Sequence, residues 1–121
     1  MKKIIINGKK DLSGTIRISG AKNAAVALIP AAIISDEIST ICNIPEISDI
    51  NSLEDILSFL NITTKRATES MIIDPTTMVN KAIPEEISSK LRASYYFMGA
   101  LLAKYKYVEM NFPGGCKIGT R

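Results

Sequence analysis

The segment that most constrains the fold is residues 24–34, which read Ala-Ala-Val-Ala-Leu-Ile-Pro-Ala-Ala-Ile-Ile. A run of this length that is apolar at almost every position predicts a helix buried nearly all round. Ser19 is its expected N-cap. Pro30 lies inside it and removes one backbone hydrogen bond, so we expect a kink or an early last turn there. Other elements must therefore cover this helix on more than one side.

Short runs rich in isoleucine and threonine, separated by turn residues, predict the strands. They lie at residues 4–6, 15–18, 38–44, 62–65, 71–73 and 107–112. The fourth and fifth are expected to form a hairpin around residues 68–70. Cys42 falls in the third run among apolar neighbours, which predicts a core residue.

Two further segments carry helical periodicity. The first is capped by Asp49 and ended by Asn61. Its apolar face consists of Ile50, Leu53, Leu57 and Leu60. The second is expected as one continuous helix from Pro84 to about Lys106, with acidic residues near its start and lysines near its end. Its predicted core stripe consists of Ile87, Leu91, Tyr95, Met98, Leu102 and Tyr105.

A second face of this last helix carries Ser88, Arg92, Gly99 and Ala103. Small side chains there would let another element or a ligand come close to Arg92. A surface arginine with no ligand is the alternative. The aromatic residues of the helix and of the strand that follows are expected to be packing residues, with no platform for stacking bases.

Composition limits the classes of fold and partner. The chain has 121 residues, of which 46% are hydrophobic, enough for one compact domain with α and β layers around a mixed sheet. Its net charge of +3 is too small and dispersed to indicate nucleic acid binding, and suits a small anionic ligand. We expect no signal peptide, no membrane span and a cytoplasmic protein, because no apolar run approaches the roughly 20 residues that a span needs.

The titratable residues narrow the chemistry. The chain has two cysteines, without the spacing of a disulfide framework or a metal site, so we expect no metal. It has no histidine, which excludes Ser-His and Cys-His nucleophile pairs. Proton transfer must then use cysteine, lysine or a carboxylate.

Residues 113–121 carry the strongest chemical motif, Pro-Gly-Gly-Cys-Lys-Ile-Gly-Thr-Arg. Glycines let backbone N–H groups face an anion, and Lys117 and Arg121 add positive charge. Such surroundings favour a thiolate and predict a reactive Cys116. By itself the motif is also compatible with a glycine-rich turn and an incidental cysteine.

A second motif, Gly20-Ala21-Lys22-Asn23, stands at a predicted strand-to-helix junction. Taken alone, Lys22 could be a solvated surface lysine and Asn23 a helix cap. Together with residues 91–94 and 113–121, in this order and spacing, the motif makes the whole chain resemble the amino-terminal region of the UDP-N-acetylglucosamine enolpyruvyl transferase family, within the EPSP synthase-like superfamily.

The resemblance implies a portion of an inside-out α/β barrel built from βαβαββ units. In that architecture residues 1–20 are strands of the other domain, and residues 21–121 are the first part of the catalytic-loop domain. The remaining parts of the active site would lie beyond Arg121, so the 121 residues alone are expected to be inert. Severed strands would leave exposed edges through which such a fragment could self-associate.

The implied reaction transfers the enolpyruvyl group of phosphoenolpyruvate to the 3′-hydroxyl of UDP-N-acetylglucosamine, with release of phosphate. It is the first committed step of peptidoglycan precursor synthesis, and no cofactor is expected. By resemblance Lys22, Arg92 and Arg121 contact the phosphate and carboxylate of phosphoenolpyruvate, and Asn23 binds the sugar nucleotide. Cys116 is then the catalytic cysteine that protonates the methylene carbon and is alkylated by fosfomycin.

Three alternatives remain open at this point. A sister enzyme would use shikimate 3-phosphate as the acceptor, although that family typically opens with a glycine-aspartate-lysine-serine type motif and lacks the cysteine loop. A truncated paralogue would bind an anionic ligand without catalysis. A redox role for Cys116 would leave Lys22, Asn23 and Arg92 unexplained.

Overall fold

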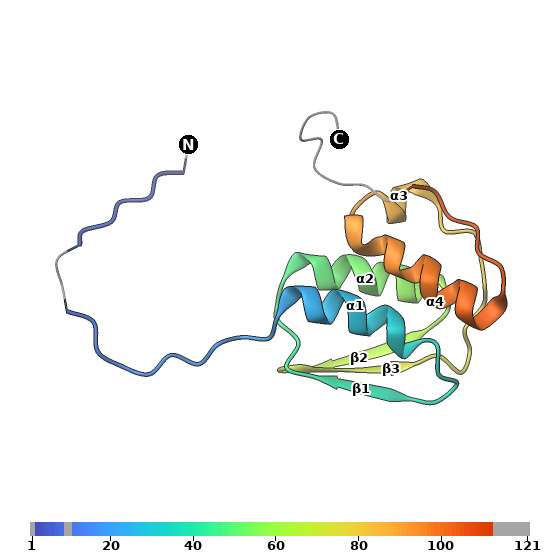
Figure 1. Ribbon diagram of the computed structural model, residues 1–121, viewed down its shortest axis with the longest axis horizontal. Helices are drawn as coiled ribbons and strands as arrows, with labels where there is room; N and C mark the ends of the chain where they lie inside the picture. The colour runs from blue at the N-terminus through green and yellow to red at the C-terminus, as the bar shows by residue number, and fades with distance from the viewer. Residues whose placement is uncertain (1, 9–10, 113–121) are drawn as a thin grey trace.

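A three-stranded antiparallel sheet forms one layer of the computed structural model, which describes residues 2–8 and 11–112 (Figure 1). Its strands are β1 (Ser39–Cys42), β2 (Thr63–Ala67) and β3 (Ser70–Asp74), in the order β1-β3-β2. Ile41 lies opposite Met71, and Thr64 opposite Ile73. The predicted hairpin and third strand are confirmed. The predicted mixed sheet is wrong for these strands, because both pairs are antiparallel.

Helices form the second layer and cover one face of the sheet (Figure 1). They are α1 (Lys22–Ala32), α2 (Ser48–Phe59) and α4 (Tyr95–Tyr105). A short helix α3 (Glu85–Ser88) and a 3₁₀ turn η1 (Arg92–Ser94) precede α4. The order α-β-α-β-β over residues 22–74 and the α+β class agree with the sequence prediction. The described residues do not show the predicted barrel.

The amphipathic prediction for α2 is confirmed. Its predicted face, Ile50, Leu53, Leu57 and Leu60, is fully buried. Asn61 follows the helix with a φ of 62°, a left-handed conformation that asparagine tolerates better than most residues. The predicted cap is wrong by two positions. Ile47 is the N-cap, so Asp49 stands within the first turn, where its charge still faces the positive end of the helix.

Helix α1 is less buried than its composition predicts. Pro30 lies inside it, as expected. The residue before the helix is Ala21, so the predicted N-cap Ser19 is wrong. Leu28 and Ile34 are about half exposed, at 52% and 48%. One side of α1 therefore has no cover among residues 2–8 and 11–112.

The predicted helix over 84–106 is broken into α3, η1 and α4. Leu91 adopts extended backbone, with φ −142° and ψ 126°, which shifts the phase of all that follows. The Ser94 hydroxyl donates a buried hydrogen bond of 2.8 Å to the carbonyl of Ser88, satisfying a group that a continuous helix would have paired with an N–H.

This break makes half of the predicted core stripe wrong, whereas Ile87, Leu91 and Tyr105 are partly buried and pack against the core as expected. On α4 the buried residues are Phe97, Ala100 and Leu101. The expected core positions Tyr95, Met98 and Leu102 are instead 44%, 40% and 50% exposed.

The predicted strands at both ends of the described chain do not form. Residues 4–6 and 15–18 are exposed and lack strand structure, because no neighbouring strand pairs with them in the described part of the chain. In the run 107–112 only Met110 pairs, in a single parallel bridge with Ile83. Cys42 is exposed at the end of β1, so its prediction as a core residue is wrong.

Candidate anion site at the helix starts

Three helices begin at the same end of the helical layer. In Figure 1, α1 and α2 start on the left, above the β2–β3 turn and the link from β1 to α2, and α4 starts higher and somewhat farther right. A helix start carries unpaired N–H groups and the positive end of the helix dipole. Three such ends on one side of the molecule make that side favourable for an anion.

Lys22 and Asn23 are the first two residues of α1, and both side chains are exposed. The Lys22 ammonium forms an ion pair with the carboxylate of Asp49, in the first turn of α2. The Lys22 side chain is 55% exposed and that of Asp49 only 20%. The Lys22 ammonium therefore contacts Asp49 on one side and solvent on the other, beside the starts of α1 and α2. The role of Asp49 as its partner was missed, because the carboxylate also fits a helix cap.

Arg92 is the first residue of η1 and is exposed just before α4. The rings of Tyr95 and Tyr96 stack beside it, with centroids 4.4 Å apart and an interplanar angle of 27°. A hydrogen bond with Tyr96 raises the pKa of Tyr95, and the nearby charge of Arg92 acts in the opposite direction. Because α4 packs on α1, Arg92 and Lys22 stand at the starts of two neighbouring helices.

Lys104 holds these two helices together at their other end. Its ammonium donates hydrogen bonds of 2.9 and 3.0 Å to the carbonyls of Ile33 and Ser35, and pairs with Asp36 at 2.9 Å. The side chain is only 12% exposed. A lysine of α4 thus satisfies carbonyls that follow the last turn of α1, where a positive charge is favourable.

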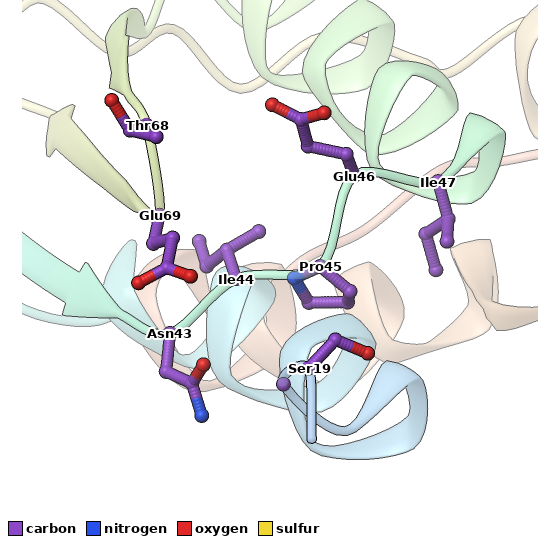
Figure 2. A pocket seen from close by; sticks show the side chains of 9 residues that line it. Ser19, Asn43, Ile44, Pro45, Glu46, Ile47, Thr68 and Glu69 are labelled. Atoms are coloured by element: carbon purple, nitrogen blue, oxygen red, sulfur yellow. The ribbon is translucent and has the colours of Figure 1, made fainter. Parts of the chain in front are cut away.

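A hollow opens below the helix starts and is shown in Figure 2. Its volume is about 420 Å³, and it is lined by Ser19, Gly20, residues 43–47, Thr68 and Glu69. The Gly20 backbone approaches the link so closely that a Cβ there would stand 1.7 Å from the carbonyl oxygen of Asn43. Sequence reasoning missed this hollow, although Gly20 was a signal for close approach.

The electrostatics of the hollow differ from those of the helix starts. Glu46 and Glu69 contribute carboxylates to its lining, as Figure 2 shows. Two acidic side chains make the hollow unfavourable for an anion. The anion-binding potential therefore lies with Lys22, Asn23 and Arg92. The other two predicted site residues, Cys116 and Arg121, lie outside the described residues.

Within residues 2–8 and 11–112, no helix is long and apolar enough to span a membrane. Over the same ranges, no three histidine, cysteine, aspartate or glutamate side chains gather where they could hold a metal ion.

Comparison with known sequences identifies the family. The sequence model of EPSP synthase (3-phosphoshikimate 1-carboxyvinyltransferase) matches residues 6–121. The chain belongs to the EPSP synthase family. Two family members named UDP-N-acetylglucosamine 1-carboxyvinyltransferase are similar over its whole length, number 2 of Oceanobacillus iheyensis at 47% identity and number 3 of Caldanaerobacter subterraneus subsp. tengcongensis at 46%. The chain spans 28% and 29% of their lengths.

A solved structure supports the same family. The chain is similar to the enolpyruvyl transferase NikO from Streptomyces tendae, with a TM-score of 0.69 and 25% sequence identity. The match covers 78% of this chain and 22% of that protein. The arrangement of helices on a small sheet is thus one that an enolpyruvyl transferase uses.

Proposed function

We propose that the protein containing these residues transfers the enolpyruvyl group of phosphoenolpyruvate to the 3′-hydroxyl of UDP-N-acetylglucosamine. The observation that carries the proposal is the 47% identity, over all 121 residues, to a protein named UDP-N-acetylglucosamine 1-carboxyvinyltransferase. This activity would supply the first committed intermediate of peptidoglycan synthesis. The predicted cytoplasmic location belongs to the same proposal.

The chemistry explains why the site needs fixed cations. The 3′-hydroxyl of the sugar loses its proton to a base as its oxygen attacks C2 of phosphoenolpyruvate, while the methylene carbon (C3) takes up a proton from an acid. The resulting tetrahedral intermediate then loses phosphate from C2 and a proton from C3, which restores the double bond. The substrate carries a carboxylate and a phosphate, so fixed positive charge stabilises both the bound state and the phosphate that leaves.

Each predicted site residue has a role in this proposal. Lys22, Arg92 and Arg121 bind the phosphate and carboxylate, and Asn23 binds the sugar nucleotide close to the reacting hydroxyl. The exposed positions of Lys22 and Arg92, at the starts of adjacent helices, support this assignment. Cys116 is proposed as the acid that protonates the methylene carbon.

The length of the relatives supports a proposal about domains. Because the chain spans 28% of a curated relative, we propose that residues 21–121 form the first part of a larger catalytic-loop domain within an α/β barrel. Residues 1–20 would belong to a second domain. The exposure of residues 11–18 and the close approach of Gly20 to Asn43 support a boundary near Gly20. We expect residues 1–121 alone to be inert.

Phosphate release tests the function directly. The longest native polypeptide containing this sequence is incubated with phosphoenolpyruvate and either UDP-N-acetylglucosamine or shikimate 3-phosphate. We expect release with the sugar nucleotide only, and loss of that release in the Cys116→Ala variant. Treatment with fosfomycin is expected to add its mass to the peptide that contains Cys116.

The same assay separates the competing functions. The family description itself favours testing shikimate 3-phosphate, since it names 3-phosphoshikimate 1-carboxyvinyltransferase. Release with shikimate 3-phosphate alone would identify the sister enzyme. No release with either acceptor, from a folded protein that still binds phosphoenolpyruvate, would favour a non-catalytic binding protein.

A further inference from the structure

The ion pair between Lys22 and Asp49 offsets the repulsion between the Lys22 charge and the positive end of α1. Lys22 opens the helix, so its positive charge stands at the positive end of the helix dipole. The first turn of α1 contains no acidic residue that could compensate. The compensating charge comes from Asp49, in the first turn of α2.

A second ion pair on the same helix provides a contrast. Lys90 pairs with Asp55 of α2 at 2.8 Å, and the two side chains are 50% and 51% exposed. Such an exposed pair contributes little to stability. Asp49 is 20% exposed, so water screens its charge less than that of Asp55 and its attraction for the Lys22 ammonium is stronger.

We propose that Asp49 is a positioning residue that holds the Lys22 ammonium between the starts of α1 and α2 for an anionic substrate. The inference rests on the proposed function of Lys22. An ammonium group has three N–H donors, so pairing with Asp49 leaves others for a phosphate. Asp49 itself touches no substrate. It acts by favouring the Lys22 rotamer in which the ammonium lies next to Asp49.

The main test measures phosphoenolpyruvate affinity in the longest native polypeptide, by titration calorimetry. In Asp49→Asn we expect the Kd to rise about tenfold, because the loss of a fixed position for the Lys22 ammonium outweighs the gain from removing a negative charge near the anion. Asp49→Glu restores most of the affinity. Asp55→Asn is the matched control on α2 and leaves the Kd unchanged.

A double-mutant cycle separates positioning from a general structural effect. If Asp49 acts through Lys22, then Asp49→Asn has no further effect on the Kd in a Lys22→Ala background. An equal effect in both backgrounds, or no effect of Asp49→Asn alone, overturns the inference. Failure of the wild-type protein to bind phosphoenolpyruvate would instead count against the proposed function.

A labelling experiment keeps the inference testable in that last case. Lysines are acetylated with acetic anhydride, with and without inorganic phosphate, and the Lys22 and Lys90 peptides are compared by mass spectrometry. We expect phosphate to protect Lys22 in the wild type and in Asp55→Asn, and to protect it several-fold less in Asp49→Asn. Equal protection of Lys22 in all three proteins, or none in the wild type, overturns the inference.

Discussion

Helices α2 and α4 have nearly the same length, 12 and 11 residues, but very different surroundings. Helix α2 packs against α1 and the sheet, and its whole apolar face is buried. Helix α4 packs mainly on α1 and leaves Tyr95, Met98 and Leu102 substantially exposed. The contrast shows that the described residues cover the apolar face of α2 but leave part of the apolar surface of α4 exposed.

The largest expected effect compares one leucine from each helix. Leu57→Ala on α2 removes a fully buried side chain and is expected to cost about 2–5 kcal/mol of unfolding free energy. Leu102→Ala on α4, where the side chain is 50% exposed, should cost about 1 kcal/mol or less. Urea unfolding followed by circular dichroism measures both. Equal losses would show that α4 is as well packed as α2.

The next effect concerns the lysine that joins α4 to α1. Lys104→Met keeps much of the side chain but removes the hydrogen bonds to Ile33 and Ser35, and is expected to cost about 1–3 kcal/mol. Lys106→Met is the control, because the Lys106 side chain is exposed and, among residues 2–8 and 11–112, bonds only to the Ala103 carbonyl of α4. Equal stabilities of the two variants in the same urea assay would refute a special role for Lys104.

A smaller effect is expected at the break between α3 and α4, which determines which side chains of α4 face the core. Ser94→Ala removes the buried hydrogen bond to the Ser88 carbonyl and should cost about 1–2 kcal/mol. The Ser88 hydroxyl is buried with no partner among the described residues, so Ser88→Ala is expected to be neutral or slightly stabilising. Thermal unfolding of both variants makes the comparison. A large loss for Ser88→Ala would mean that its hydroxyl has a partner.

The smallest expected effects are on the pH dependence of stability, which differs between the end of β3 and the segment after α4. Hydrogen bonds from Thr76 lower the pKa of Asp74 below 3.8, at the end of β3. Its contribution to stability is present above pH 3.8 and is lost as the pH falls through the folded-state value. A hydrogen bond with Glu109 raises the pKa of Tyr107 above 10.0, after α4. That contribution is present below pH 10.0 and is lost as the pH rises through the folded-state value.

Side-chain NMR titration checks both directions. Thr76→Val is expected to return the pKa of Asp74 toward 3.8, and Glu109→Ala to return that of Tyr107 toward 10.0. Each variant serves as the control for the other. A change in both residues from one substitution would contradict the separation of the two regions.

Sequence periodicity predicted the elements whose partners are local. The hairpin of β2 and β3 and the buried face of α2 follow from residues close in sequence, and both are confirmed. Periodicity failed at Leu91, where the backbone is extended and the Ser94 hydroxyl bonds the Ser88 carbonyl in place of a helical N–H. It also failed for residues 4–6 and 15–18, since a strand needs a partner that the described residues do not supply.

The candidate site shows the same division. The sequence motif located Lys22 and Asn23 at a helix start, which the structure confirms, and Arg92 on a helix, which the break at Leu91 corrects. Asp49 could not be recognised as the partner of Lys22, because the contact joins two helices and leaves no trace in local spacing. The roles of Cys116 and Arg121 stay predictions.

The parallel bridge between Ile83 and Met110 has a consequence for the path of the chain. Helix α4 carries the backbone about 16 Å away from Arg92, at 1.5 Å per residue. The Ile83 N–H donates to the carbonyl of Glu109, and the Asn111 N–H donates to that of Ile83, so the chain returns to the level where α3 began. These two hydrogen bonds thus hold the backbone at residues 109–111 next to Ile83, just before α3. A length change in α4 would have to be absorbed before Glu109 to leave these hydrogen bonds in place.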